Sequence, residues 1–222
     1  MVVFVRGGDY VLANNIKKQW LKVLLFVTLI YMVYDGVYVL ANSKRLLLAP
    51  SKISNSIIPL VTLYNDIFLI VFALLVLYLF NRHQLIMALA VDTRQEVVGL
   101  VVGLVFFLFV IIKIQPSHAT DAYNIIHTLV TVALLEELIF RGFILNHLID
   151  MGCGKASYLI SGMLWGAIYG LEPMIVGGIA PLSAMLPVLF WGMIVGTGAG
   201  IIYQRTGSLW LVIYMHAALT LL

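Results

Sequence analysis

The sequence predicts an all-α fold, a polytopic membrane helix bundle of about seven transmembrane helices. The composition carries this prediction, because 63% of the 222 residues are hydrophobic and only 10% are charged. A soluble domain is usually about 45–50% apolar and about 25% charged. The apolar excess is grouped into long runs, and about 20 consecutive apolar residues are enough for a helix to cross a bilayer.

Seven apolar runs are long enough to be candidate spans. They lie at about residues 20–41, 57–80, 97–115, 123–147, 157–178, 182–203 and 208–222. The chain then divides into three parts, which are an N-terminal interfacial segment (1–19), accessory transmembrane helices (20–115) and core helices that carry the motifs (116–222). In the sixth run, Gly192, Gly196 and Gly200 recur every four residues. Such a stripe of small residues predicts a close helix-packing face.

The distribution of basic residues predicts a multi-pass protein of the cell membrane with a cytoplasmic N-terminus. Cytoplasmic loops carry an excess of Lys and Arg, and this orientation gives eight on the inner side and four on the outer side. The inner eight are Arg6, Lys17, Lys18, Lys22, Arg82, Arg94, Lys155 and Arg205. No basic cluster is dense enough to bind nucleic acid. The lipid bilayer is therefore the expected partner of this surface.

Three ionisable residues, Glu136, Glu137 and Arg141, lie in the fourth predicted span. Such residues are costly inside a membrane and by default mark a functional site. Glu137 and Arg141 are four residues apart, so they can pair on one helix face. Glu136 projects about 100° away and has no partner in its own helix, which suits a general base. The residues alone leave a second interpretation open, in which both glutamates only join helices through the arginine.

These residues open a motif with a known counterpart. Residues 136–143 read Glu-Glu-Leu-Ile-Phe-Arg-Gly-Phe and resemble the first motif of the CPBP family. This family comprises membrane proteins related to the type II CAAX prenyl endopeptidases and to bacteriocin-processing and immunity (Abi-type) proteins. The resemblance continues through residues 190–196, 204–210 and 215–217, and it covers about residues 123–222.

The resemblance implies an intramembrane glutamate protease. By position, Glu136 would be the base that activates a water, and Glu137 and Arg141 would form a supporting pair. His216 would be the histidine of the last helix, which holds the developing oxyanion in this family. The implied substrate is a membrane-associated peptide or protein.

Two positions depart from the family pattern. The family's Phe-x-x-x-His motif falls on Trp165 and Tyr169, and its final His-x-x-x-Asn falls on His216 and Thr220. A phenol with a pKa of about 10 can donate a hydrogen bond but is a poor base at neutral pH. Tyr169 is therefore a candidate donor to the oxyanion beside His216, and Thr220 can donate one hydrogen bond with a shorter reach than asparagine.

The depths of three of these residues predict that they meet. At about 1.5 Å per residue, Glu136 lies about 16 Å from the inner end of the fourth span. By the same measure Tyr169 lies about 18 Å into the fifth span, and His216 about 12 Å into the seventh. All three therefore fall in one layer of a hydrocarbon core about 30 Å thick.

No cofactor is expected, although the sequence leaves a metal open. With Tyr169 in place of the family histidine, one good nitrogen ligand remains, which is fewer than the three or four ligands of a usual zinc site. A metal-free glutamate mechanism fits this sequence better. The alternatives are an inactive or weakly active relative that serves as a membrane scaffold, regulator or bacteriocin immunity protein, and a transporter. The transporter is disfavoured because the sequence has no internal repeat.

Overall fold

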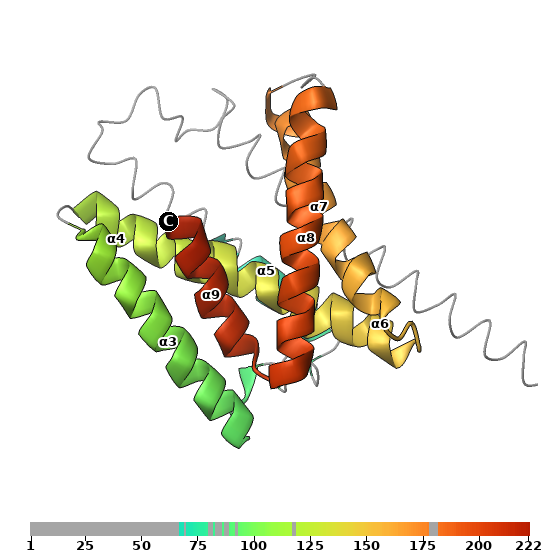
Figure 1. The fold of residues 1–222 in the computed structure, drawn as a ribbon, viewed down its shortest axis with the longest axis horizontal. Coiled ribbons are helices and arrows are strands. Elements are labelled where there is room, and N and C mark those ends of the chain that lie inside the picture. The colour runs from blue at the N-terminus through green and yellow to red at the C-terminus, as the bar shows by residue number, and fades with distance from the viewer. Residues whose placement is uncertain are drawn as a thin grey trace, which may run out of the picture.

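The computed structural model describes residues 67–68, 70–79, 82, 86, 89–91, 93–116, 119–177 and 182–222. From residue 93 onward the described chain is helical, and none of the described residues forms a strand (Figure 1). The elements are α3 (Arg94–Ile114), α4 (Ala119–Ile126), η2 (His127–Leu134), α5 (Leu135–Glu137), η3 (Leu138–Leu145), α6 (Asn146–Asp150), α7 (Ala156–Gly177), α8 (Leu182–Thr206) and α9 (Leu209–Leu221). The predicted all-α class is therefore confirmed. The predicted interfacial segment 1–19 and the first span 20–41 lie outside the described residues.

Residues 119–150 form one continuous helical rod, because every junction from η2 to α6 keeps right-handed helical torsions. The predicted fourth span, 123–147, lies inside this rod. Two stretches of the rod, η2 and η3, are π-helical, and the short segment α5 with its two glutamates lies between them. π-Helical turns are rare and often occur at functional sites.

Local sequence sets both ends of α3. The Thr93 hydroxyl accepts a hydrogen bond from the Glu96 N–H, and the Glu96 carboxylate accepts one from the Thr93 N–H. This capping box satisfies two backbone donors of the first turn. At the other end Gln115 adopts a left-handed conformation, with φ 52°, and Pro116 follows it. The helix therefore ends one residue before the predicted limit of 115.

Helices α7 and α8 approach each other closely at glycines. A Cβ atom at Gly192 would lie 2.6 Å from the Cα atom of Gly166, and one at Gly196 would lie 2.9 Å from the Cα atom of Gly162. The two backbones therefore touch along the predicted small-residue stripe, and the packing face is confirmed there. At Gly200 the nearest atom would be 3.4 Å away, which is ordinary contact.

Hydrogen bonds join four helix ends at one end of the bundle. The Ser208 hydroxyl accepts from the Leu211 N–H at the start of α9, and it donates to the Glu96 carbonyl in α3. The Tyr158 hydroxyl, near the start of α7, donates to the side-chain oxygen of Gln204 near the end of α8. The starts of α3, α7 and α9 and the end of α8 are therefore neighbours.

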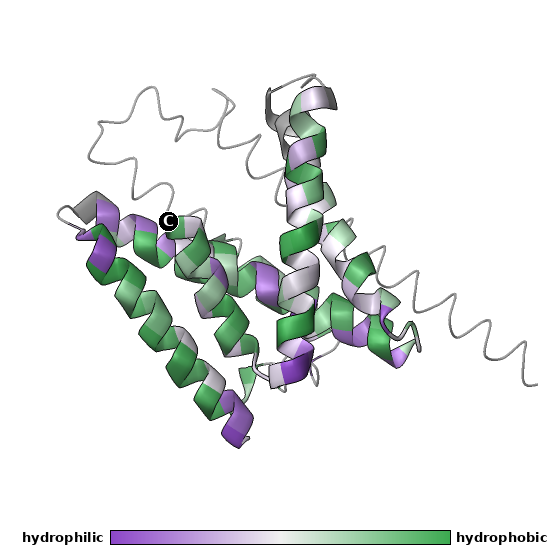
Figure 2. Ribbon diagram, in the orientation of Figure 1, coloured by the Kyte–Doolittle hydropathy of each residue, from purple (hydrophilic) through white to green (hydrophobic). Residues whose placement is uncertain are grey.

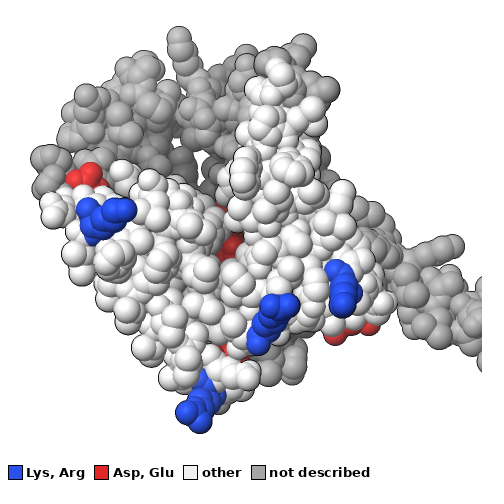
Figure 3. Space-filling model, in the orientation of Figure 1, with Lys and Arg blue, Asp and Glu red and all other residues white. Residues whose placement is uncertain are grey.

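Basic residues mark the same end. Arg94 is the first residue of α3, Lys155 directly precedes α7, and Arg205 lies in the last turn of α8. Lys113 lies in the last turn of α3, at the opposite end of that helix. Figure 3 shows most of the basic side chains on the lower part of the molecule and one at its upper left.

Two described helices are long and apolar enough to cross a membrane by length and composition. They are Arg94–Ile114 and Ser183–Thr206. Helix α3 is mostly hydrophobic along its length, whereas hydrophobic turns alternate with near-neutral ones in α8 (Figure 2). Residues Ile70–Leu79 and Leu209–Leu221 form shorter apolar helices. The two candidate spans agree with a membrane protein, and the count of seven stays a prediction.

The glycine contact gives a test of how α7 and α8 pack. Gly192→Ala places a Cβ atom against the α7 backbone, so the helices must separate, and overpacking of this kind usually costs about 1–3 kcal/mol. The matched control is Gly198→Ala on the same helix, where a Cβ atom would meet nothing within 4 Å. We expect Gly192→Ala to lower the Tm of the purified protein in detergent and Gly198→Ala to leave it unchanged or raise it. Equal Tm values for the two variants would contradict the close packing.

Candidate active site

The site is built on a buried ion pair within the long rod. Arg141 Nη1 donates to Glu137 Oε1 at 2.9 Å, and both side chains are 1% exposed. Arg141 Nη2 donates to the backbone carbonyl of Gly196 in α8, also at 2.9 Å. The predicted i,i+4 pair is confirmed, and it is tied to a second helix. A buried charge needs such partners, because removing one of them leaves the other uncompensated.

His216 of α9 binds the same carboxylate. Its Nδ1 atom lies 2.9 Å from Glu137 Oε1. A carboxylate paired with an arginine can only accept hydrogen bonds, so Nδ1 is the donor in this contact. The other ring nitrogen, Nε2, then lies 4.0 Å from Glu136 Oε2. Glu137 therefore keeps a proton on Nδ1 and sets the direction of the His216 ring.

Glu136 is held from α7 by two donors. The Trp165 indole Nε1–H donates to Glu136 Oε2 at 2.6 Å, and the Tyr169 hydroxyl donates to Oε1 at 2.5 Å. The depth argument from the sequence, which placed Glu136, Tyr169 and His216 in one layer, is confirmed by these distances. The Tyr169 hydroxyl proton points at Glu136, so it is not positioned as the expected oxyanion donor.

Trp165 packs at the centre of the group. Arg141 Cζ lies 5.5 Å from the indole centroid, within range of a cation–π interaction. The indole meets the His216 ring edge to face, with centroids 5.5 Å apart and planes at 82°, and its centroid is 4.8 Å from that of Tyr169. The two glutamates, the arginine, the histidine and the two aromatic residues therefore form one connected cluster.

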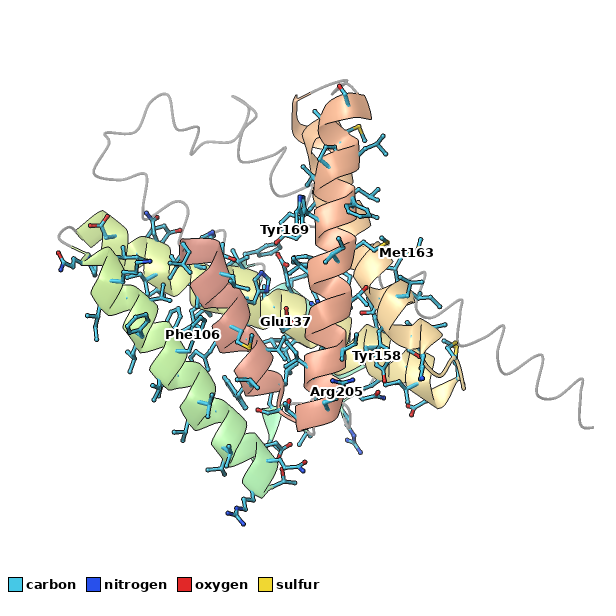
Figure 4. All side chains as sticks on the ribbon, viewed as in Figure 1. Phe106, Glu137, Tyr158, Met163, Tyr169 and Arg205 are labelled. Atoms are coloured by element: carbon cyan, nitrogen blue, oxygen red, sulfur yellow. The ribbon has the colours of Figure 1, made fainter. Side chains whose placement is uncertain are left out.

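The cluster is accessible at one carboxylate. The side chain of Glu136 is 22% exposed, and that of His216 is 10% exposed, in contrast to the sealed Glu137. Figure 3 shows acidic atoms at the floor of a recess between α8 and the neighbouring helices. Figure 4 labels Glu137 and Tyr169 in the same central part of the molecule, beside α8. A reactant could therefore reach Glu136, whereas Glu137 is shielded.

Comparison with known protein families gives a match over the part of the chain that carries this cluster. Residues 118–222 match the family of type II CAAX prenyl endopeptidase Rce1-like proteins. We call these matched residues the Rce1-like domain. The resemblance drawn from the motifs is thereby confirmed, and this family is one of membrane-embedded CAAX-type proteases. No curated protein and no solved structure matches the chain.

The structure places Thr220 differently from the other predicted site residues of the Rce1-like domain. Its hydroxyl donates to the His216 carbonyl one turn earlier in α9, at 3.0 Å, and its side chain is exposed. The hydroxyl would have to leave this bond in order to donate to an oxyanion. Five of the six predicted residues meet in the cluster, and the predicted role of Thr220 stays a prediction.

The described part of the Rce1-like domain holds no group of three or more His, Cys, Asp or Glu side chains that could together bind a metal ion. Two atoms that could each bind a metal face each other in the cluster. They are His216 Nε2 and Glu136 Oε2, which lie 4.0 Å apart. One oxygen of Glu137, Oε1, already accepts from Arg141 and His216.

Sequence reasoning missed two members of the cluster. The sequence presents Trp165 only as a replacement for the family's phenylalanine, and it predicts Gly196 only as a packing residue. A signal for the first was available, because a buried indole N–H usually finds a hydrogen-bond partner. No signal pointed to the Gly196 carbonyl, because a backbone acceptor is present at every residue and only helix packing selects one.

The buried pair of the Rce1-like domain makes a stability prediction. Arg141→Ala leaves Glu137 buried without its charge partner, and breaking such a pair usually costs about 3–5 kcal/mol. We expect low yield and a lowered Tm in detergent. The control is Arg205→Ala, at the exposed end of α8, which should fold normally. A normally expressed Arg141→Ala protein with an unchanged Tm would show that the pair is not sealed from water.

Proposed function

We propose that the protein is an intramembrane endopeptidase that cleaves a membrane-associated peptide or protein with a water activated by Glu136. The observation that carries this proposal is the pairing of a held, partly exposed Glu136 carboxylate with His216 Nε2 at 4.0 Å. That separation is too long for a direct hydrogen bond, and polar groups at such a distance are often bridged by water. The reacting water would lie there, within reach of both groups.

The hydrolysis follows from these two groups. The water oxygen attacks the carbonyl carbon of the scissile peptide bond, and the water proton moves to the Glu136 carboxylate. The carbonyl oxygen becomes an oxyanion, which accepts a hydrogen bond from protonated His216 through Nε2–H. Glu136 then returns the proton to the peptide nitrogen as the C–N bond breaks. The products are a carboxylic acid and an amine, which exchange a proton in water to give a carboxylate and an ammonium group, and both side chains regain their starting states.

Glu137 and Arg141 support this chemistry without contacting the substrate. The Glu137 carboxylate accepts from His216 Nδ1, so it favours the protonated imidazole that the oxyanion requires. Arg141 compensates the remaining charge and anchors the group to α8. Ionisable side chains inside a membrane are costly. The presence of Glu136, Glu137 and Arg141 together therefore favours a functional role for these residues.

We also propose that the protein crosses the membrane several times, with its N-terminus in the cytoplasm. Three of the basic residues predicted on the inner side, Arg94, Lys155 and Arg205, gather at one end of the described helices, and Lys113 lies at the other end of α3. This arrangement supports the predicted excess of positive charge at the cytoplasmic surface.

The enzymatic proposal predicts the behaviour of two variants in proteoliposomes. The probes are a quenched fluorogenic peptide with a prenylated C-terminal Cys-aliphatic-aliphatic-X sequence and the same peptide without the prenyl group. Glu136→Gln keeps the shape of the side chain and removes the base, so it should abolish cleavage. His216→Ala should lower kcat by about a hundredfold to a thousandfold, the usual effect of one lost oxyanion donor.

The control for Glu136→Gln is Asp150→Asn, the same chemical change at an exposed residue at the end of α6, which should leave the rate unchanged. Both proteins are compared at equal abundance in the membrane. If the wild-type protein cleaves neither peptide, or if Glu136→Gln cleaves at the wild-type rate, the proteolytic proposal is wrong. A binding or scaffolding role would then remain.

The topological proposal predicts the reactivity of two cysteines. Cys153 lies between α6 and α7 and is partly exposed, so it should react with a membrane-impermeant maleimide from the cytoplasmic side. In a Cys153→Ala background, Pro116→Cys beyond the end of α3 should react from the opposite side. Labelling of both positions from the same side would contradict the arrangement.

A further inference from the structure

The hold of α7 on Glu136 has a geometric basis. Trp165 and Tyr169 are four residues apart on α7, and residues at that spacing lie on one helix face. Their N–H and O–H groups reach the two different oxygens of one carboxylate, at 2.6 Å and 2.5 Å. Hydrogen bonds to an ionised group are short and about twice as strong as bonds between neutral groups. With both oxygens held, rotation of the carboxylate is restricted.

Trp165 holds the oxygen that faces the histidine. The indole N–H binds Glu136 Oε2, and the same oxygen lies 4.0 Å from His216 Nε2. The indole is buried, and its ring contacts both Arg141 and the edge of His216. Any movement of the indole would therefore change the direction of the Oε2 atom and the gap to the histidine together.

We propose that Trp165 is a positioning residue for the hydrolysis. Its indole N–H, together with the Tyr169 hydroxyl, holds the Glu136 carboxylate so that Oε2 faces His216 Nε2 across the place of the reacting water. This inference rests on the proposed function for its catalytic meaning, whereas the hold itself can be tested without catalysis. A held base is aligned with the water before the substrate binds, and such alignment lowers the barrier of the chemical step.

Two substitutions each remove one donor and keep an aromatic ring at the position. Trp165→Phe deletes the indole N–H, and Tyr169→Phe deletes only the hydroxyl oxygen, so it preserves the packing most closely. Because each variant removes one hydrogen bond to a charged group, we expect kcat to fall about tenfold to a hundredfold. KM should stay near the wild-type value, because both groups act through Glu136.

A spectroscopic measurement detects the hold independently of activity. The infrared difference spectrum between the wild-type protein and Glu136→Gln gives the carboxylate band of Glu136. We expect this band to shift in Trp165→Phe and in Tyr169→Phe, because each variant frees one carboxylate oxygen. The matched control is Trp191→Phe on α8, where the side chain is 63% exposed, and here the band and kcat should both be unchanged.

The outcomes separate this inference from the proposed function. An unshifted Glu136 band in both phenylalanine variants would overturn the hold, even if Glu136→Gln abolishes cleavage. A shifted band with wild-type kcat would show that the hold exists and is not used in catalysis, which overturns the positioning role. If Glu136→Gln cleaves normally while the band still shifts, the proposed function fails and the contact geometry stands.

Discussion

The buried charge of Arg141 is the constraint on which the rest of the site depends. An arginine side chain that is 1% exposed among apolar helices needs acceptors, and it finds Glu137 in its own rod and the Gly196 carbonyl in α8. Gly196 is also a glycine at which a Cβ atom would lie 2.9 Å from the Cα atom of Gly162 in α7. One residue of α8 therefore takes part both in the close packing against α7 and in the compensation of the charge.

The same pairing organises the groups to which we assign the chemistry. Glu137 Oε1 accepts from both Arg141 and His216, so one carboxylate compensates the arginine and orients the imidazole. Helix α7, brought close to α8 by its glycines, carries Trp165 and Tyr169 to the neighbouring Glu136. The two adjacent glutamates thus take different environments. Glu137 is sealed, whereas Glu136 is held at its two oxygens and remains partly exposed, which agrees with the roles that we propose for them.

The sequence predicted what depends on spacing along single helices. The Glu137–Arg141 pair follows from four-residue spacing, the shared layer of Glu136, Tyr169 and His216 from helical rise, and the glycine face from its repeat. Contacts that depend on how neighbouring helices are oriented about their axes cannot be predicted from spacing along one helix. The Gly196 carbonyl and the Trp165 N–H belong to such contacts, so the sequence did not predict them. The π-helical stretches on both sides of Glu136 add to this difficulty, because they change the residues per turn and therefore the direction of each side chain. The number of spans before residue 93 stays a prediction.

Chemical rescue tests most directly whether Glu136 acts as the base. Glu136→Ala removes the carboxylate and leaves a space beside an accessible site, so added formate should restore part of the cleavage activity in proteoliposomes by accepting the water proton. Glu137→Ala should not be rescued, because its carboxylate position is only 1% exposed and serves the arginine and histidine. Rescue of Glu136→Ala alone is the result that the account predicts. Equal rescue of both variants, or full activity of Glu136→Ala without formate, would contradict it.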